Sequence, residues 1–219
     1  MIEYIVNLLY MIPIAIISLS VHESAHGYAS YLLGDPTARN LGRITLNPFK
    51  HFDLLGFVCM ALFRVGWAKP VPVNARYYKN PRIGMAITAA AGPLSNLLLA
   101  LIGIIGSETA WLFMKNMSGE GAAYFALATL FNFFYLLSLC NISLAVFNLM
   151  PVPPFDGSRI LYVFLPPKYY FGIMRYERYI MLGMLVLFYI GVFDKPLNII
   201  VNGIFNGMVS FVELIPIFR

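Results

Sequence analysis

The chain has 219 residues, of which 60% are hydrophobic and only 11% are charged. A soluble domain carries about 25% charged residues, so this composition leaves too little polar surface for a soluble fold. It also excludes disordered, collagen-like and disulfide-rich proteins. The long continuous apolar runs favour an all-α polytopic membrane protein in the lipid bilayer over an outer-membrane barrel. We interpret the net charge of +5 as a signal of how the chain is oriented in the membrane, and we expect no nucleic-acid partner.

The first apolar stretch, 4–33, predicts one long helix that ends at the Gly-Asp-Pro of 34–36. Its last turns contain His22, Glu23 and His26. Thirty helical residues span about 45 Å, more than a bilayer core requires. The polar turn is therefore expected toward the interfacial end of the helix.

The following loop, 35–82, holds eight of the fifteen basic residues. Within it, 42–48 has strand-like residues bounded by Gly and Asn-Pro, and 54–63 is apolar but too short to span. The prolines of Lys-Pro-Val-Pro-Val at 69–73 predict extended backbone. We therefore expect a short strand-like or re-entrant segment in this loop.

Further apolar runs predict the remaining spans. They lie at 83–106, 122–147 and 179–193, with 196–217 as a fifth span or a helix on the membrane surface. About four to five transmembrane helices are thus expected. We interpret 1–219 as one membrane-embedded domain, with a core over 4–165 and C-terminal helices over 175–219.

Charge sets the expected orientation in the cell membrane. The basic loops 35–82 and 148–178 fall on one side, and the connector 107–121, with one Lys against two Glu, falls on the other. The positive-inside rule places the two basic loops in the cytoplasm. The histidine turn and any site formed with 148–178 would then face the cytoplasmic side.

The strongest chemical signal is His-Glu-x-x-His at 22–26. The i, i+4 spacing puts His22 and His26 on one helix face, where both imidazoles can bind one metal ion. Glu23 stands beside them, placed as general base toward a metal-bound water. Ionisable residues within a membrane span are costly, so they favour a functional site over side chains that merely extend to the interface.

A zinc protease needs a third protein ligand and an open fourth position. The candidates in this chain are His51, Asp53, Asp156 and Asp194. Asp156 is favoured because it follows Pro-Val-Pro-Pro, which cannot be helical, and non-helical backbone beside a span is tolerated where it lines a cavity. Gly157 permits the turn that aims this carboxylate. The alternative is an ordinary Asp-Gly turn.

Three motifs in order resemble the site-2 protease family of membrane-embedded zinc metalloproteases. They are His-Glu-x-x-His at 22–26, Gly-Pro-x-x-Asn at 92–96 and N-L-M-P-V-P-P-F-D-G at 148–157. The segment 42–53 resembles a short prokaryotic branch of that family. We expect no PDZ domain between these motifs and no C-terminal CBS domain, unlike in better-known relatives.

The resemblance implies one zinc ion held by His22, His26 and Asp156, with Glu23 as the catalytic acid and base. It implies that Asn148 stabilises the oxyanion or holds the substrate backbone, although a residue at a helix end can also cap orphan carbonyls. Asn96 is a further candidate for contact with the substrate or the oxyanion, or it could instead satisfy backbone groups freed by the neighbouring proline. His51 could approach the zinc, guard the site or sit at the interface.

The predicted function is hydrolysis of peptide bonds in or near transmembrane segments of membrane proteins. A helical substrate must unwind first, and its freed backbone could pair with the strand-like 42–46 or the extended 151–154. One alternative is a membrane metal-binding protein or transporter without hydrolysis, although no internal repeat supports it. A second is an inactive scaffold, which the filled ligand and base positions disfavour.

Overall fold

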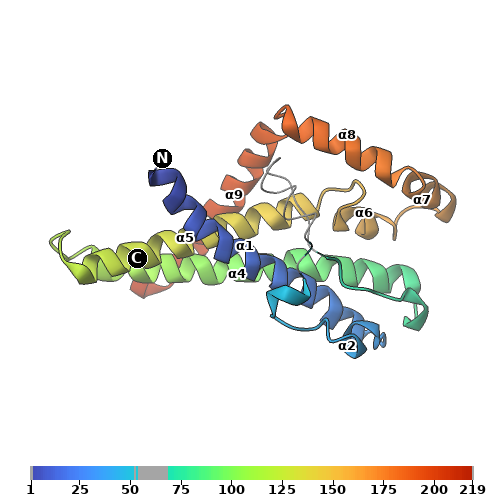
Figure 1. Ribbon diagram of the computed structural model, residues 1–219, viewed down its shortest axis with the longest axis horizontal. Helices are drawn as coiled ribbons and strands as arrows, with labels where there is room; N and C mark the ends of the chain where they lie inside the picture. The colour runs from blue at the N-terminus through green and yellow to red at the C-terminus, as the bar shows by residue number, and fades with distance from the viewer. Residues whose placement is uncertain (1, 52, 54–68, 219) are drawn as a thin grey trace.

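A computed structural model describes residues 2–51, 53 and 69–218 of the chain. Its described residues form helices and no strands (Figure 1). The helices are α1 (Ile2–Leu32), α2 (Thr37–Asn40), α4 (Pro81–Met114), α5 (Ala122–Asn148), α6 (Asp156–Leu161), α7 (Pro167–Met174), α8 (Glu177–Tyr189) and α9 (Asp194–Val212). Short 3-10 turns cover Pro48–Lys50, Ala75–Tyr77 and Pro216–Phe218. The predicted all-α class is confirmed.

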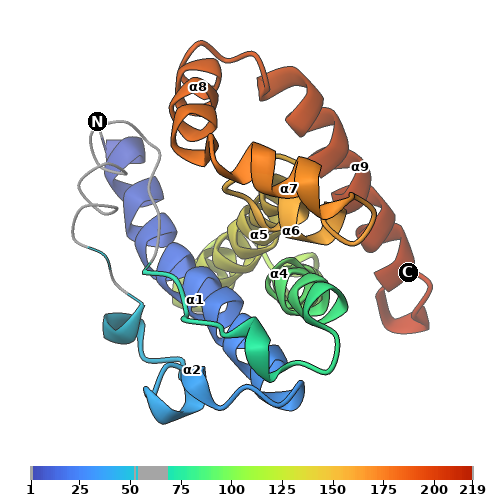
Figure 2. The ribbon, with the colours of Figure 1, turned by 90° about the vertical axis from the view of Figure 1, so that its right-hand side faces the viewer.

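The antiparallel pair α4 and α5 forms the centre of the molecule (Figure 1). Small residues allow this close approach, because a Cβ at Gly103 would lie 2.8 Å from the Phe134 carbonyl oxygen and one at Gly106 would meet the Phe134 ring. Figure 2 looks along this pair, with α1 on one side and α9 on the other. The central pair therefore has two different flanking helices.

The apolar core lies where α9 packs on the central pair. Ala100, Ile142, Val146 and Val201 are buried there. Large apolar side chains also point outward, and Leu98 and Phe113 of α4 are 65% and 66% exposed. Such outward apolar faces are expected of helices that meet lipid, because the bilayer takes the place of a protein partner.

By length and composition, α4 and α5 can each cross a membrane. The pair α8 and α9 meets the same test only together, bent by 84° at a short break, so the described residues hold two candidate spans, or three with the bent pair. The chain is a membrane protein, but the predicted number of four to five spans is not reached. There are two reasons: α1, predicted as the first span, does not meet the test in the described residues, and 179–193 and 196–217, predicted as separate helices, make at most one broken span.

The predicted strand in the 35–82 loop is wrong for its described part. Residues 42–46 form turns and bends, and Gly42 has a positive φ of 61°. The Thr45 carbonyl accepts hydrogen bonds from Ser24 Oγ at 2.5 Å and His51 Nε2 at 2.8 Å, so side chains rather than a second strand bind this backbone. The predicted re-entrant piece, 54–63, lies outside the described residues. Residues 71–74 are non-helical, as the prolines predict.

Candidate metal centre

The two histidines of α1 face the central helix pair. His22 and His26 lie one turn apart and are 5% and 9% exposed, and their Nε2 atoms are 3.0 Å from each other. Gly92 of α4 lies directly against both rings. A Cβ built there would be 2.5 Å from His26 Nε2 and 2.6 Å from His22 Cε1. The glycine therefore leaves room for the imidazole pair.

A hydrogen bond fixes each ring by its Nδ1 atom. His22 Nδ1 is 2.6 Å from Asn96 Oδ1, and His26 Nδ1 is 2.7 Å from the Thr88 carbonyl oxygen. A carbonyl oxygen can only accept, so both rings donate from Nδ1 if the Asn96 amide is oriented in this way. Each Nε2 then keeps a lone pair that can bind a metal.

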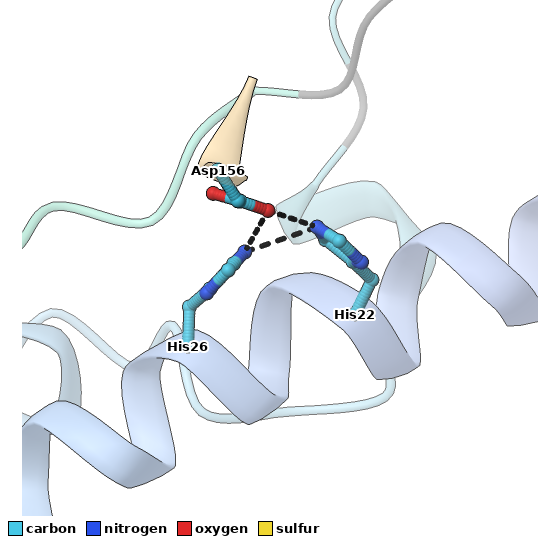
Figure 3. A group of neighbouring side chains, drawn as sticks. All are labelled: His22, His26 and Asp156. Atoms are coloured by element: carbon cyan, nitrogen blue, oxygen red, sulfur yellow. Dashed lines mark hydrogen bonds and ion pairs between the residues drawn. The ribbon is translucent and has the colours of Figure 1, made fainter. Parts of the chain in front are cut away.

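Asp156 comes from the other half of the chain and completes the group (Figure 3). It opens α6 after a non-helical segment in which the Pro153–Pro154 peptide is cis. Its Oδ2 lies 3.2 Å from the Nε2 atoms of both His22 and His26. Gly157 allows the approach, since a Cβ there would collide with the Leu149 carbonyl at the end of α5.

The charge of Asp156 is stabilised by the two rings. Burial alone would raise the pKa of this carboxyl, but His22 and His26, when protonated at Nε2 as well as at Nδ1, donate hydrogen bonds to it that outweigh burial and hold the pKa well below its ordinary value. The side chain is therefore a carboxylate at neutral pH. An ionised carboxylate beside two imidazole nitrogens is a donor set that divalent zinc accepts.

The spacing of the three groups fits a metal ion. One ligand atom from each of His22, His26 and Asp156 lies within 4.8 Å of the others. Ligands about 2.0–2.2 Å from a tetrahedral zinc lie about 3.3–3.6 Å apart. The observed separations of 3.0 and 3.2 Å need to widen by only a few tenths of an ångström. Three protein ligands also leave one position for water or substrate.

Glu23 neighbours this group but turns to a different partner. Its Oε2 accepts a hydrogen bond of 2.8 Å from the backbone N–H of Val71, in the extended segment that follows the 35–68 part of the loop. Val71 is 8% exposed. One carboxylate oxygen is thus fixed by the backbone, and Oε1 has no hydrogen bond within the described residues.

Asn96 supports His22 rather than the backbone near Pro93. Its Nδ2 donates to Asn141 Oδ1 at 2.7 Å, and Asn141 Nδ2 donates to Ser18 Oγ at 2.8 Å. Ser18, Asn96 and Asn141 are all fully buried. The relay joins α1, α4 and α5 and holds one imidazole in place.

The other two predicted polar residues, Asn148 and His51, make side-chain hydrogen bonds to backbone carbonyls. Asn148 ends α5, and its Nδ2 donates to the Leu144 carbonyl of its own helix at 2.9 Å. His51 is 3% exposed and its Nε2 meets the Thr45 carbonyl, so His51 braces the loop and does not join His22, His26 and Asp156.

Sequence reasoning missed Thr88, Val71 and Asn141 as supports of the centre. A signal existed for Asn141, since an Asn within an apolar span is a costly residue that needs a partner. None existed for the other two, because they act through a backbone carbonyl and a backbone N–H, which every sequence position offers.

Comparison with protein families matches residues 113–190 to Peptidase family M50. The Bacillus subtilis protein YwhC, named as a candidate zinc metalloprotease, is 40% identical over 179 residues, covering 82% of this chain and 80% of YwhC. The Mycolicibacterium smegmatis protein Rip2, named likewise, is 25% identical over 158 residues, or 70% of this chain and 56% of Rip2.

A third relative is the zinc metalloprotease MJ0392 of Methanocaldococcus jannaschii. It is 33% identical over 100 residues, which cover 46% of this chain and 25% of MJ0392. No solved structure matches the chain.

Proposed function

This chain belongs to peptidase family M50, the zinc metalloproteases, and from that premise we propose that it cleaves peptide bonds in or near transmembrane segments of membrane proteins. The observation that carries the proposal is the convergence of His22, His26 and Asp156, from different halves of the chain, with Glu23 next to His22 in sequence. We propose these three as the ligands of one zinc ion.

The residues of this chain then have separate chemical roles. A bound zinc ion would supply Lewis acidity, lowering the pKa of water and polarising the peptide carbonyl. Glu23 takes the proton from the attacking water with the carboxylate oxygen that Val71 leaves free. The same carboxyl then returns the proton to the leaving amine. Asn96 and the Thr88 carbonyl keep both imidazoles aimed throughout.

Asn148 is proposed to stabilise the oxyanion or to hold the substrate backbone. The residue closes α5, and the chain runs from there through the proline segment to Asp156. Its present bond goes to the carbonyl of Leu144, four residues earlier in the same helix, so a change of rotamer would free the amide. The oxyanion would then accept a hydrogen bond from Nδ2.

We propose that the substrate backbone lies in a groove along α1, whose helical residues are neighbours in sequence of the His-Glu-x-x-His turn. It has a volume of about 290 Å³ and lies between α1 and the loop, lined by Val21, Ser24, Ala25, Tyr28, Ile44, Thr45 and Leu46. An unwound substrate needs partners for its backbone. Proline at Ile44 and Leu46 is expected to lower cleavage at unchanged zinc content, and unchanged cleavage would contradict this placement.

We further propose that all of 1–219 forms one membrane-embedded unit with the site toward the cytoplasm. The described parts of the basic loops around α2 and α6 lie toward one end of the central pair, and the connector between α4 and α5 lies at the other (Figure 1). The excess of Lys and Arg at the first end supports this orientation. In this arrangement α1 also crosses the membrane.

The decisive experiment uses Glu23→Gln in the purified full chain with a single-span model substrate. Cleavage is expected to fall by about 100- to 10,000-fold because the general base is lost. One zinc per chain should remain bound, as measured by elemental analysis. Glu120→Gln, in the exposed connector, is the matched control and should keep wild-type activity.

Three outcomes separate the alternatives. Cleavage retained by Glu23→Gln would refute the assignment of the base. A wild-type protein that binds zinc but cleaves no membrane substrate would support metal binding without hydrolysis. A wild-type protein that binds no zinc would remove the proposed centre altogether.

A further inference from the structure

Residues 69–74 form an extended strap that crosses the proposed site next to Glu23. The strap contains two prolines, at 70 and 72, which have no N–H. Val71 between them supplies the one backbone donor of this three-residue stretch, and it bonds to Glu23 Oε2. The position of the strap therefore sets the position of the proposed base.

Two buried side chains hold the strap at its ends. Arg43 Nη2 donates to the carbonyl oxygens of Lys69, at 2.7 Å, and Pro70, at 3.2 Å. At the far end Asp35 Oδ2 accepts from the backbone N–H of Asn74 at 2.7 Å. The Val71 donor lies between these two anchors.

Arg43 has an unusual environment for a cation. It is only 9% exposed, it forms no ion pair with any described residue, and its Nε has no hydrogen-bond partner among them. A buried charge is normally paired with a carboxylate because desolvation is costly. Here the carbonyl oxygens of Lys69 and Pro70 are the partners of the Arg43 guanidinium. The role of this buried cation is therefore to hold the strap in place.

We infer that Arg43 is a positioning residue for the proposed protease reaction. It fixes the strap, the strap presents the Val71 N–H, and that N–H holds one oxygen of Glu23 so that the other faces the attacking water. This inference rests on the proposed function for its catalytic consequence. The physical link from Arg43 to Val71 can be tested without any cleavage.

The first readout is hydrogen exchange on the full chain prepared without metal. The stretch 69–73 carries only three amide hydrogens, since two of its five residues are proline. Arg43→Gln is expected to speed exchange in this stretch at least about tenfold, as expected when a local structure opens. Glu23→Ala should expose the Val71 amide alone, because Lys69 N–H keeps its bond to the His51 carbonyl.

The second readout separates kcat from KM and from zinc content. Arg43→Gln should lower kcat about 10- to 100-fold, the usual cost of losing a supporting contact, with KM and zinc content near wild type. Arg43→Lys, which keeps the positive charge as well as a donor, should recover part of kcat. Arg39→Gln removes the same charge from an exposed site of the same loop and should change neither readout.

Each outcome decides the inference. Unchanged exchange in Arg43→Gln, or faster exchange with unchanged kcat, would overturn it. If Arg43→Gln lowers thermal stability, Val71→Pro tests the same donor directly and should also lower kcat with zinc retained. A wild type without any cleavage would defeat the proposed function and leave the exchange result standing.

Discussion

The helices α1 and α9 both flank the α4–α5 pair (Figure 2), but they bury opposite kinds of side chain. α1 turns a polar stripe inward, with Ser18, His22, His26 and Ser30 at four-residue spacing and all buried. α9 buries Val201 and Val212, and its asparagines at 198, 202 and 206 face outward. Both helices carry polar residues in an apolar chain, but only α1 buries them.

The difference shows where a membrane protein accepts the cost of burying polar groups. Each buried polar side chain of the α1 stripe has a partner on another element, as Ser18 has in Asn141 and His26 has in Thr88. An inward polar stripe with no partners would be expensive in lipid. The exposed asparagines of α9 make no side-chain hydrogen bond among the described residues and form no comparable site there. The buried polar side chains of the α1 stripe, which all have hydrogen-bond partners, therefore distinguish α1, which carries two of the proposed metal ligands, from α9.

Gly92→Ala should give the largest effect, because it inserts a methyl group against the α1 stripe. The new Cβ would lie 2.5 Å from His26 Nε2. Overpacking of this kind costs about 1–3 kcal/mol, and here it also displaces two proposed ligands. Zinc content should fall far below one ion per chain, measured by elemental analysis, with lower thermal stability. Full zinc content in this variant would contradict the proposed ligand positions.

Asn96→Ala should come next, since it removes the oxygen that orients His22. Loss of such a support lowers metal affinity by about 10- to 100-fold. Competition with a chelating dye measures this affinity. Asn206→Ala, on the outward stripe of α9, is the matched control and should bind zinc as the wild type does. Equal affinity in the two variants would erase the contrast between the helices.

The parts of this contrast that sequence could predict are local. The i, i+4 spacing of His22 and His26 and the proline break before Asp156 are readable along the chain, and so were the helices themselves. The relatives and the family match confirm the protease family that these motifs indicated.

What sequence could not predict depends on packing between distant segments. The Asn stripe of 196–217 gave no sign that it would face outward, and the break between α8 and α9 falls at a short Gly-containing turn within apolar sequence. The segment 42–46 has strand-forming residues, but the described residues include no neighbouring strand that could pair with it. The side chains of Ser24 and His51 bind its Thr45 carbonyl instead.

Asp35→Asn tests the end of the α1 stripe and should have a moderate, pH-dependent effect. Asp35 accepts hydrogen bonds from Ser30 Oγ, from the backbone N–H of Asn74 and from Thr37. Burial alone would raise its pKa, but these donors, Thr37 foremost, hold the pKa below its ordinary value.

The direction in which stability changes with pH follows from the lowered pKa of Asp35. The carboxylate stabilises the fold above the unfolded pKa of about 3.9, and this contribution is lost as the pH falls through the folded value. Asp35→Asn should therefore be less stable than wild type at pH 7 by about 1–3 kcal/mol and converge on it in acid. Denaturant titrations at several pH values measure this, with Glu120→Gln as the control. A difference that does not change with pH would contradict the role of the charge.

Gly203→Ala should have the smallest effect and the opposite sign from Gly92→Ala. It is the same substitution, made in α9 where a Cβ would meet nothing within 4 Å. Glycine within a helix costs about 0.5–1 kcal/mol relative to alanine, because its unfolded backbone has more freedom to lose. The variant should be slightly more stable in thermal unfolding and keep its zinc. A destabilised Gly203→Ala would mean that another surface packs against this face of α9, and the contrast between an inward and an outward flank would then no longer hold.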